Sequence, residues 1–217
     1  MPAVATLLGL LVALQSSEPL DISHKFVAND KSSFTIDGKA DANGQEITVN
    51  GEFQVEIKKL LDGGRADAHI TTPKMKVAVG DQELPLNDGE LDAVFTSSGL
   101  PESFGVKDVE MVSAMYFFSN LRPTEKIKVG DSYKIDLKTK DSAVTLKGTG
   151  KFVEIKEVNG KKVVVMKSNL TVEPENEAPG ELIVTSEYEQ GGQLIKSTIE
   201  LTIEEVKGTF KINRKST

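Results

Sequence analysis

Two-residue alternation of apolar and polar side chains is the feature that most constrains how this chain can fold. In residues 47–58 the odd-numbered positions are apolar apart from Gly51, and the even-numbered positions are all polar or charged. Residues 195–204 show the same pattern, with Ser197 as the polar exception in the apolar set. Because successive side chains of a strand point to opposite faces, this alternation indicates strands with one buried and one solvated side. Such strands are typical of antiparallel sheets.

Turn signals separate these strands at the spacing of an antiparallel meander. Shorter alternating stretches lie at residues 34–39, 133–137, 182–188 and 210–212. Between them stand Asn43-Gly44, Asp88-Gly89 and Asn159-Gly160, whose residue types accept the positive φ angles that tight hairpins require. The pattern therefore predicts a mainly β protein, built on a curved antiparallel sheet or half-barrel.

A long internal repeat indicates that this sheet has two related halves. Residues 33–57 recur at residues 132–155, with an offset of ninety-nine positions for most of their length. The matched residues include Ser33, Phe34, Ile36, Asp37 and Lys39, which correspond to Ser132, Tyr133, Ile135, Asp136 and Lys138. A repeat of this length predicts two halves built from the same strands. We expect a first half at residues 18–123, which includes one helix, and a second half at residues 124–217. The two halves would share one core.

A one-residue deletion in the second copy predicts a β-bulge. Leu146 and Phe152 lie on even positions, whereas Val153 and Ile155 continue the apolar pattern on odd positions. A bulge near Phe152-Val153 would return both sets to the core face. The first copy shows no such slip.

One segment departs from the strand pattern. Residues 108–121 read DVEMVSAMYFFSNL and place Met111, Met115, Phe118 and Leu121 on one helical stripe. The spacing predicts an apolar helix packed on the concave face of the sheet. This helix would either belong to the ordinary core or line and gate an apolar cavity.

The N-terminus has the character of a secretory leader. Residues 3–14 form an apolar run of twelve residues, followed by polar sequence from Gln15 onwards. That length suits the core of a signal peptide and is short for a membrane-spanning helix. Residues 1–17 are thus expected to be a signal peptide, with an uncleaved membrane anchor or a buried first helix as alternatives. The first interpretation predicts export to the periplasm or cell envelope.

Charge and composition exclude several functional classes. The formal net charge of −7 argues against nucleic acid as a partner, because nucleic-acid binding depends on a positive field. The chain contains no cysteine, which excludes disulfides, thiolate nucleophiles and cysteine-type metal sites. With 38% apolar residues it can still bury a sizeable core.

Residues with catalytic or metal-binding chemistry are few. His24 shares its phase with Leu20, Ile22 and Phe26, which predicts a structural histidine on the apolar side of an early strand. His69 is out of phase with its apolar neighbours and should face water. Two separated histidines make a weak metal or catalytic site, and no nucleotide-binding or hydrolase motif is present. We therefore predict a protein that is not an enzyme, with no cofactor and no metal.

A hydrolase would need a pair of carboxylates such as the repeated acids Asp37 and Asp136. They could support hydrolysis only if they converged in one cleft. Each is out of phase with its apolar neighbour, Ile36 or Ile135, so the more favoured role is an outward-facing position on a strand.

The segment from Pro123 through Lys128-Val129-Gly130-Asp131-Ser132-Tyr133 resembles the entry into the second half of many bacterial exported proteins. Together with the leader, the two β halves and the apolar helix, residues 20–214 resemble the half-barrel envelope proteins typified by LolA, LppX and LprG. That resemblance implies a curved antiparallel sheet whose concave face holds acyl chains, in proteins that carry lipids or lipoproteins. The lipidated cysteine of the LppX type is absent.

These observations favour an exported binding protein for an apolar ligand, held between the curved sheet and the helix. The expected partner is a lipid or the acyl chain of a lipoprotein, with an envelope protein as a further candidate. The alternative is a structural or protein-interaction module of the envelope with a filled core. The residues expected to line the ligand space are Val49, Phe53, Val55, Ile57, Met111, Met115, Phe118, Phe152, Ile199 and Leu201.

Overall fold

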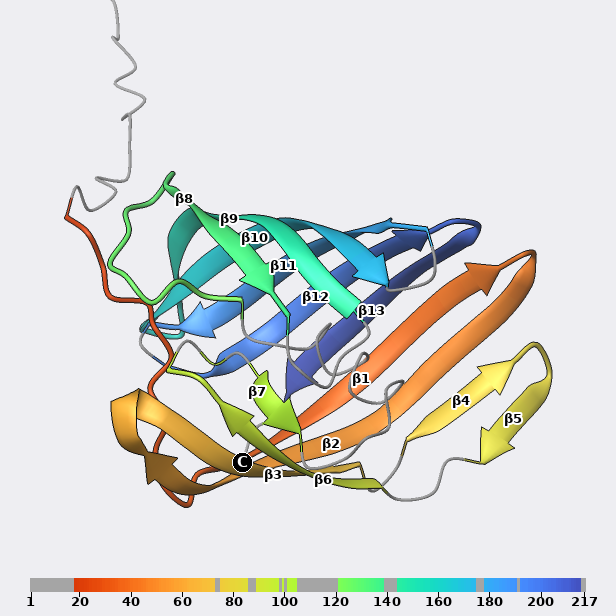
Figure 1. Cartoon of the computed structure of the whole chain (residues 1–217), viewed down its shortest axis with the longest axis horizontal. Helices are drawn as coiled ribbons and strands as arrows, with labels where there is room; N and C mark the ends of the chain where they lie inside the picture. Colours follow the sequence, from red (N-terminus) through yellow and green to blue (C-terminus); the bar gives the residue numbers. More distant parts are fainter. Residues whose placement is uncertain are drawn as a thin grey trace, which may run out of the picture.

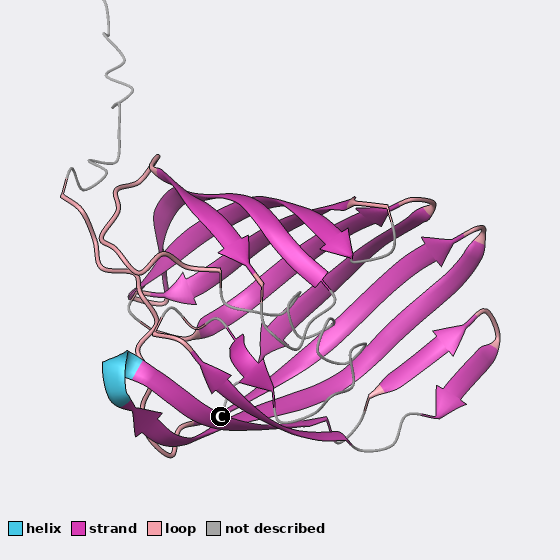
Figure 2. Cartoon of the chain, in the orientation of Figure 1, coloured by secondary structure: helices cyan, strands magenta, loops and turns pink. Residues whose placement is uncertain are grey.

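A computed structural model describes residues 18–72, 75–85, 89–97, 99, 101–104, 121–138, 144–174, 178–190 and 192–215. Within these residues the chain is almost entirely β-structure (Figure 1, Figure 2), as the alternation predicts. A single 3₁₀ turn at Asp62–Gly64 is the exception among the described elements. The strands are β1 (Lys31–Ala42), β2 (Gln45–Leu61), β3 (Arg65–Thr72), β4 (Lys76–Val79), β5 (Gln82–Pro85), β6 (Gly89–Phe95), β7 (Pro101–Phe104), β8 (Ser132–Leu137), β9 (Val144–Val158), β10 (Lys161–Pro174), β11 (Gly180–Glu189), β12 (Leu194–Ile203) and β13 (Val206–Arg214).

All thirteen strands belong to one antiparallel sheet. The order across the sheet is β7-β6-β3-β2-β1-β13-β12-β11-β10-β9-β8, with β4 paired to β2 and β5 paired to β4. Strands β1 to β7 are therefore contiguous, and so are β8 to β13. The two groups join where β1 pairs with β13, from Phe34 opposite Arg214 to Ala42 opposite Val206. Figure 1 shows that the sheet is strongly curved and stays open, with β7 and β8 at its two ends.

The core lies on the concave face. Its main cluster draws side chains from both groups of strands, among them Phe34 and Ile70 from the first and Leu146, Phe152 and Ile199 from the second. Phe152 and Leu146 are completely buried. Since a fully buried large apolar side chain contributes about 1.5–3 kcal/mol relative to an exposed one, this cluster stabilises both groups of strands.

The repeated stretches each form an antiparallel hairpin, but with different pairing. In the first copy Phe34 lies opposite Phe53. The matching pair in the second copy would be Tyr133 with Phe152, yet Tyr133 lies opposite Gly150. The β8–β9 pairing is therefore shifted by two residues relative to β1–β2. A shift of two residues keeps each side chain on its own face, because the side-chain period of a strand is also two.

A bulge occurs in the second copy. The β9–β10 register shifts so that Val165 lies opposite Glu154 and Met166 lies opposite Phe152, which leaves Val153 as the extra residue. This confirms the bulge predicted from the deletion. Ile155 is returned toward the core, whereas Val153 itself points outward and is 40% exposed.

A second bulge lies in β2, directly after the first copy. The β2–β3 register shifts between Ile57 and Lys59, so that Lys58 is the extra residue. Lys58 follows the last apolar position of the alternating stretch, Ile57. The lysine is exposed, so no apolar side chain marks the slip in the sequence.

The helix predicted at residues 108–121 lies outside the described residues except for Leu121, which is buried. Met111, Met115 and Phe118 are likewise outside them, and their role stays a prediction. Within the described ranges, no helix has both the length and the apolar character needed to cross a membrane. The leader predicted at residues 1–17 also lies outside the described residues.

Candidate functional site

A pocket of about 140 Å³ opens into the concave face at the end of the sheet where β1 begins and β11 ends. Its walls come from six strands of the sheet, β1, β2, β3, β11, β12 and β13, and from β6 and β7 at the sheet's end. The segment of residues 18–30, here termed the strap, supplies five further lining residues, and Gly99 and Gln193 complete the wall. The lining residues are His24, Lys25, Phe26, Val27, Asp30, Ser32, Phe34, Phe53, Val55, Ile57, Ile70, Phe95, Gly99, Pro101, Ser186, Tyr188, Gln193, Leu194, Ser197 and Ile212.

Aromatic rings form much of the wall. Phe34 and Phe53 lie opposite each other on β1 and β2, and their rings stack with centroids 5.0 Å apart at an interplanar angle of 16°. Phe26 of the strap reaches Phe95 of β6 at 6.0 Å between centroids. Such rings bury large apolar areas at little conformational cost. The wall is thus suited to hydrocarbon.

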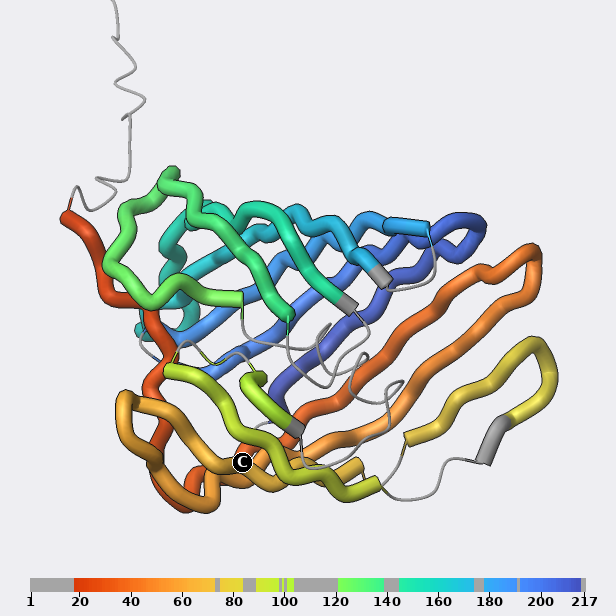
Figure 3. The backbone as a smooth tube through the Cα atoms, in the orientation of Figure 1, coloured from red at the N-terminus to blue at the C-terminus, as the bar shows by residue number. Residues whose placement is uncertain are grey.

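The strap is held against the sheet at both ends. The backbones of Leu20 and Ile127 form an isolated antiparallel bridge with hydrogen bonds of 2.8 and 3.1 Å. At the other end the Asn29 N–H donates to the Ile57 carbonyl at 2.7 Å, and the Ile57 N–H donates to the Asp30 carbonyl at 2.9 Å. Figure 3 shows the strap running past the segment that leads into β8 before it enters β1.

Between these ends the strap forms no strand, so the prediction of an early strand is wrong. Ile22 is nevertheless 1% exposed and belongs to the main core. The alternation of Leu20, Ile22, His24 and Phe26 arises because an extended segment packs one side against the concave face. It pairs with no strand between the Leu20–Ile127 bridge at one end and the hydrogen bonds of Asn29 and Asp30 to Ile57 at the other.

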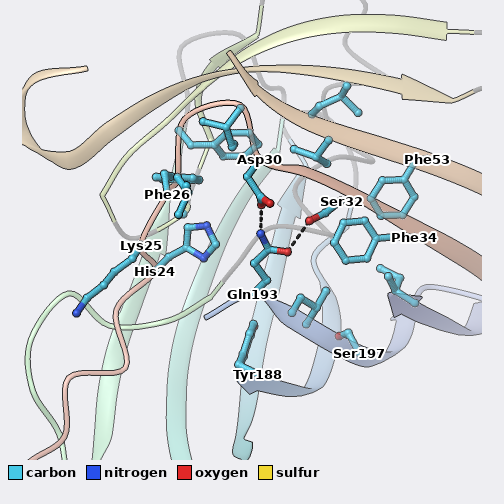
Figure 4. Close-up of a pocket in the computed structure, with 18 of the residues that line it drawn as sticks. His24, Lys25, Phe26, Asp30, Ser32, Phe34, Phe53, Tyr188, Gln193 and Ser197 are labelled. Carbon is cyan, nitrogen blue, oxygen red and sulfur yellow. Dashed lines mark hydrogen bonds between the residues drawn. The ribbon is translucent and has the colours of Figure 1, made fainter. Parts of the chain in front are cut away.

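A polar rim crosses the pocket (Figure 4). The Ser32 hydroxyl donates to the Gln193 amide oxygen Oε1 at 2.5 Å, and the Gln193 Nε2 donates to the Asp30 carboxylate. Gln193 stands in the turn between β11 and β12, where the Glu189 N–H donates to the Gln193 carbonyl at 3.1 Å. The rim therefore connects residues more than 160 positions apart in the chain.

Arg122 is a buried cation beside the pocket, with 2% of its surface exposed. Its guanidinium lies 4.4 Å from the centre of the Tyr188 ring, and Nη1 donates to the Gly192 carbonyl at 2.8 Å. Nη2 lies in hydrogen-bond contact with His24 Nδ1. Desolvation lowers the pKa of Arg122 to about 10, against the opposing effect of Tyr188, so it stays charged at neutral pH.

His24 is neutral in this environment. Burial first, and then the charge of Arg122, lower its pKa to about 3. Its ring meets Phe26 edge-on with centroids 4.2 Å apart. The structural role predicted for His24 fits these contacts. His69 lies on the other face of β3 from Ala68 and Ile70, as predicted from its phase, and its Nδ1 is 2.7 Å from Asp92.

Tyr133 is a buried residue of the main core. Its hydroxyl donates to the Leu121 carbonyl, and burial raises its pKa above the ordinary value. Gly150 faces the ring on β9. A Cβ at Gly150 would lie 2.2 Å from Cζ and 2.4 Å from the hydroxyl oxygen of Tyr133, so only glycine fits there.

The predicted lining residues divide into three groups. Phe53, Val55 and Ile57 line the pocket. Val49, Phe152, Ile199 and Leu201 lie in or against the main core without lining it. Met111, Met115 and Phe118 are outside the described residues. The strap and the Gln193 turn were missed, because no local pattern signals that they meet.

The inner face stays apolar beyond the pocket. Val49, Phe210 and Leu201 are half-buried against the core. Val49 and Phe210 flank Gly38 in the sheet, and the Phe210 ring occupies the space where a Gly38 side chain would lie. A strip of apolar side chains therefore continues from the pocket along β1, β2 and β13.

A second hollow among the described residues is polar in character. A shallow hollow of about 440 Å³ lies over β1, β12 and β13, but charged side chains such as Lys39, Glu46, Glu200 and Lys207 line much of it.

The repeated acids do not converge. Asp37 lies on β1, opposite Lys211 of β13, and Asp136 lies on β8, opposite Lys147 of β9. Five strands separate β1 from β8 in the sheet order. Both side chains are exposed. Nor does the described part of the chain contain a cluster of three or more His, Asp or Glu side chains placed to hold a metal ion.

No protein-family model and no curated protein sequence matches the chain. Among solved structures, lipovitellin, in a structure concerned with lipid–protein interactions, matches 88% of this chain with a TM-score of 0.53 and 11% identity. The match spans 26% of the lipovitellin chain, so this chain corresponds to about a quarter of that protein. The likeness shows a shared fold, which in this chain is a large, open, curved antiparallel sheet.

Two bacterial structures match more loosely. An exported protein assigned a YmcC-like fold, from Bacteroides fragilis, covers 90% of this chain and all of its own length at 12% identity, with a TM-score of 0.38. A domain assigned to outer membrane lipoprotein sorting, from Vibrio parahaemolyticus, covers 86% of this chain and 83% of its own at 9% identity, with a TM-score of 0.26. The second belongs to the class of lipoprotein-sorting proteins that the sequence resembles, but TM-scores this low support no inference about function.

Proposed function

We propose that this protein is an exported, non-enzymatic binding protein that holds an apolar chain of a lipid or lipoprotein on the concave face of its sheet. The observation that carries the proposal is the pocket of about 140 Å³, with the Phe34–Phe53 and Phe26–Phe95 ring pairs in its walls. Concave, mostly apolar pockets with a few convergent polar groups are the usual form of ligand sites.

The size of the pocket sets what it can hold. Its volume is close to that of an engineered apolar cavity of about 150 Å³ that binds benzene. The pocket therefore accommodates part of one hydrocarbon chain. The rest of that chain would lie along the half-buried strip of Val49, Phe210 and Leu201. If the helix predicted at residues 108–121 forms, it would cover this strip.

The fold shared with lipovitellin supports the proposal, because that structure is described for its lipid–protein interactions. The resemblance to LolA-type proteins implies an envelope setting, in which an envelope protein would deliver or receive the ligand. The alternative, a structural module without a ligand, is distinguished by the experiment below.

Native mass spectrometry of the protein after exposure to phospholipid vesicles tests the proposal. We expect a lipid adduct on the wild-type protein, and loss of that adduct in Ser197→Leu, which fills the pocket floor. Thr198→Leu is the matched control, because its side chain lies on the opposite face of β12. Far-UV circular dichroism confirms that both variants fold. An adduct-free wild-type protein would support the structural module instead, and equal adducts on both variants would show that lipid binds outside this pocket.

A further inference from the structure

One carboxylate, that of Asp30, lines the pocket. The other titratable side chains that line it are His24, Lys25 and Tyr188. His24 is neutral, and burial keeps the Tyr188 phenol protonated by raising its pKa. Lys25 forms an ion pair with Asp21 at 3.4 Å, and Figure 4 shows its side chain pointing away from the other labelled residues. Asp30 is therefore the acidic side chain that a ligand at the rim would meet.

Arg122 contacts two lining residues, His24 and Tyr188, but does not line the pocket itself. Its Nη1 also donates to the Gly192 carbonyl. Asp30 is the carboxylate that lies in the rim itself.

The rim has capacity for a further hydrogen-bonding partner. The Gln193 Nε2 carries two N–H groups, and one of them donates to Asp30 Oδ2. The Asp30 carboxylate can accept several hydrogen bonds, at Oδ1 as well as at Oδ2. A hydroxyl group placed here can donate to Asp30 and accept from Gln193 at once. A carboxylate head group would instead face Asp30 with a like charge.

The exposure of the lining residues orients an amphipathic ligand. Asp30 and Gln193 are half-buried, whereas Ile70 and Ile212 deeper in the pocket are 4% and 1% exposed. A hydroxyl-bearing head would thus lie at the rim, with its hydrocarbon chain against the buried isoleucines and the Phe34–Phe53 pair.

On the premise that the proposed lipid-binding function holds, we propose that this pocket selects single-chain lipids with an uncharged, hydroxyl-bearing head group and rejects fatty-acid anions. A monoacylglycerol has this chemistry. The Ser32–Gln193–Asp30 rim forms hydrogen bonds with the hydroxyl of the head group, and the small apolar pocket holds one hydrocarbon chain.

Single-tryptophan reporters make the selection measurable, because the chain contains no tryptophan. Val55→Trp places an indole at the pocket, and Gln54→Trp places one on the exposed opposite face of the same strand as the matched control. The probes are a monoacylglycerol and a fatty acid with the same brominated acyl chain, titrated at pH 8 below their micelle concentrations. Bromine quenches a nearby indole, so quenching of Val55→Trp alone reports occupancy of the pocket.

We expect the monoacylglycerol to bind at least about tenfold more tightly than the fatty-acid anion, since the anion would meet a like charge at the rim. Asp30→Asn in the Val55→Trp background should reduce that ratio to about two or less, whereas the exposed Asp37→Asn should leave it unchanged.

The outcomes separate the two proposals. If neither lipid quenches Val55→Trp more than Gln54→Trp, and native mass spectrometry of the unsubstituted protein also shows no adduct, the lipid-binding function fails. If both lipids bind equally, if the anion binds more tightly, or if Asp30→Asn leaves the ratio unchanged, lipid binding stands and the head-group selection is overturned.

Discussion

Gly150 is the position where one added methyl group should be most informative about the core. A Cβ there would lie 2.2 Å from Cζ of Tyr133, inside any allowed contact distance. The ring cannot move freely, because Tyr133 is 9% exposed and its hydroxyl donates to the Leu121 carbonyl. Gly150→Ala must therefore displace either the ring or the β9 backbone.

The expected cost follows from these two contacts. Overpacking a well-packed core costs about 1–3 kcal/mol, and loss of the Tyr133–Leu121 hydrogen bond adds about 1 kcal/mol. We expect Gly150→Ala to lower the free energy of unfolding by about 2–4 kcal/mol. For a protein of this size each kcal/mol corresponds to about 2–4 °C in Tm.

A double-mutant cycle isolates the cause. Tyr133→Leu removes the ring, so Gly150→Ala in that background should cost less than about 1 kcal/mol. Urea unfolding followed by far-UV circular dichroism measures all four proteins, with the exposed Thr149→Ala as a control for strand propensity. An equal cost of Gly150→Ala with and without the Tyr133 ring would refute this reasoning.

Further outcomes follow from burial and protonation. Phe152→Ala should lower the free energy of unfolding by about 3–5 kcal/mol, but Val153→Ala by less than about 1 kcal/mol, because the bulge turns Val153 outward; similar costs in chemical unfolding would contradict the bulge. The folded-state pKa of His24 is about 3, below its ordinary 6.5, so its contribution to stability is complete above pH 6.5 and is lost progressively as the pH falls toward 3. Between pH 6.5 and 5 this loss is about 2 kcal/mol, and His24→Gln should lack it; parallel stability curves for the two proteins would argue against a buried neutral His24. Glu187 forms ion pairs with Lys156 at 2.7 Å and Lys196 at 3.1 Å, and 15% of its side chain is exposed. Glu187→Gln should therefore destabilise the protein by about 1–2 kcal/mol in thermal unfolding, whereas removal of the exposed Lys39–Glu46 pair should cost less than about 0.5 kcal/mol. Equal effects would contradict this prediction.

The strands were predictable because alternation is a local signal. Strands β1, β2, β8, β11, β12 and β13 all contain the alternating stretches, and the Asn43-Gly44 and Asn159-Gly160 turns adopt the expected positive φ angles. The 14-residue β10 was missed, because Val163, Val164, Val165 and Met166 are all buried and form a continuous apolar run instead of an alternating one.

Most of the site was beyond local patterns. Three of the ten predicted lining residues line the pocket, all from β2, where the alternation is strictest. The hydrogen bonds from Gln193 to Ser32 and Asp30 depend on how β1, β11 and β12 are arranged in space. Arg122 was not predicted as part of the site, since its contacts are with Tyr188 and Gly192, which are distant in the sequence. The two-residue register difference between the repeated hairpins likewise has no local signal.

Photo-crosslinking tests the central proposal most directly. A monoacylglycerol with a diazirine at the end of its acyl chain is bound, irradiated and mapped by peptide mass spectrometry. We expect adducts in the peptides that contain Phe34, Phe53, Ile70 or Ile212, which meet in the concave pocket from β1, β2, β3 and β13. Adducts confined to exposed outer-face positions such as Val153 and Val158, or no adducts at all, would contradict a ligand on the concave face.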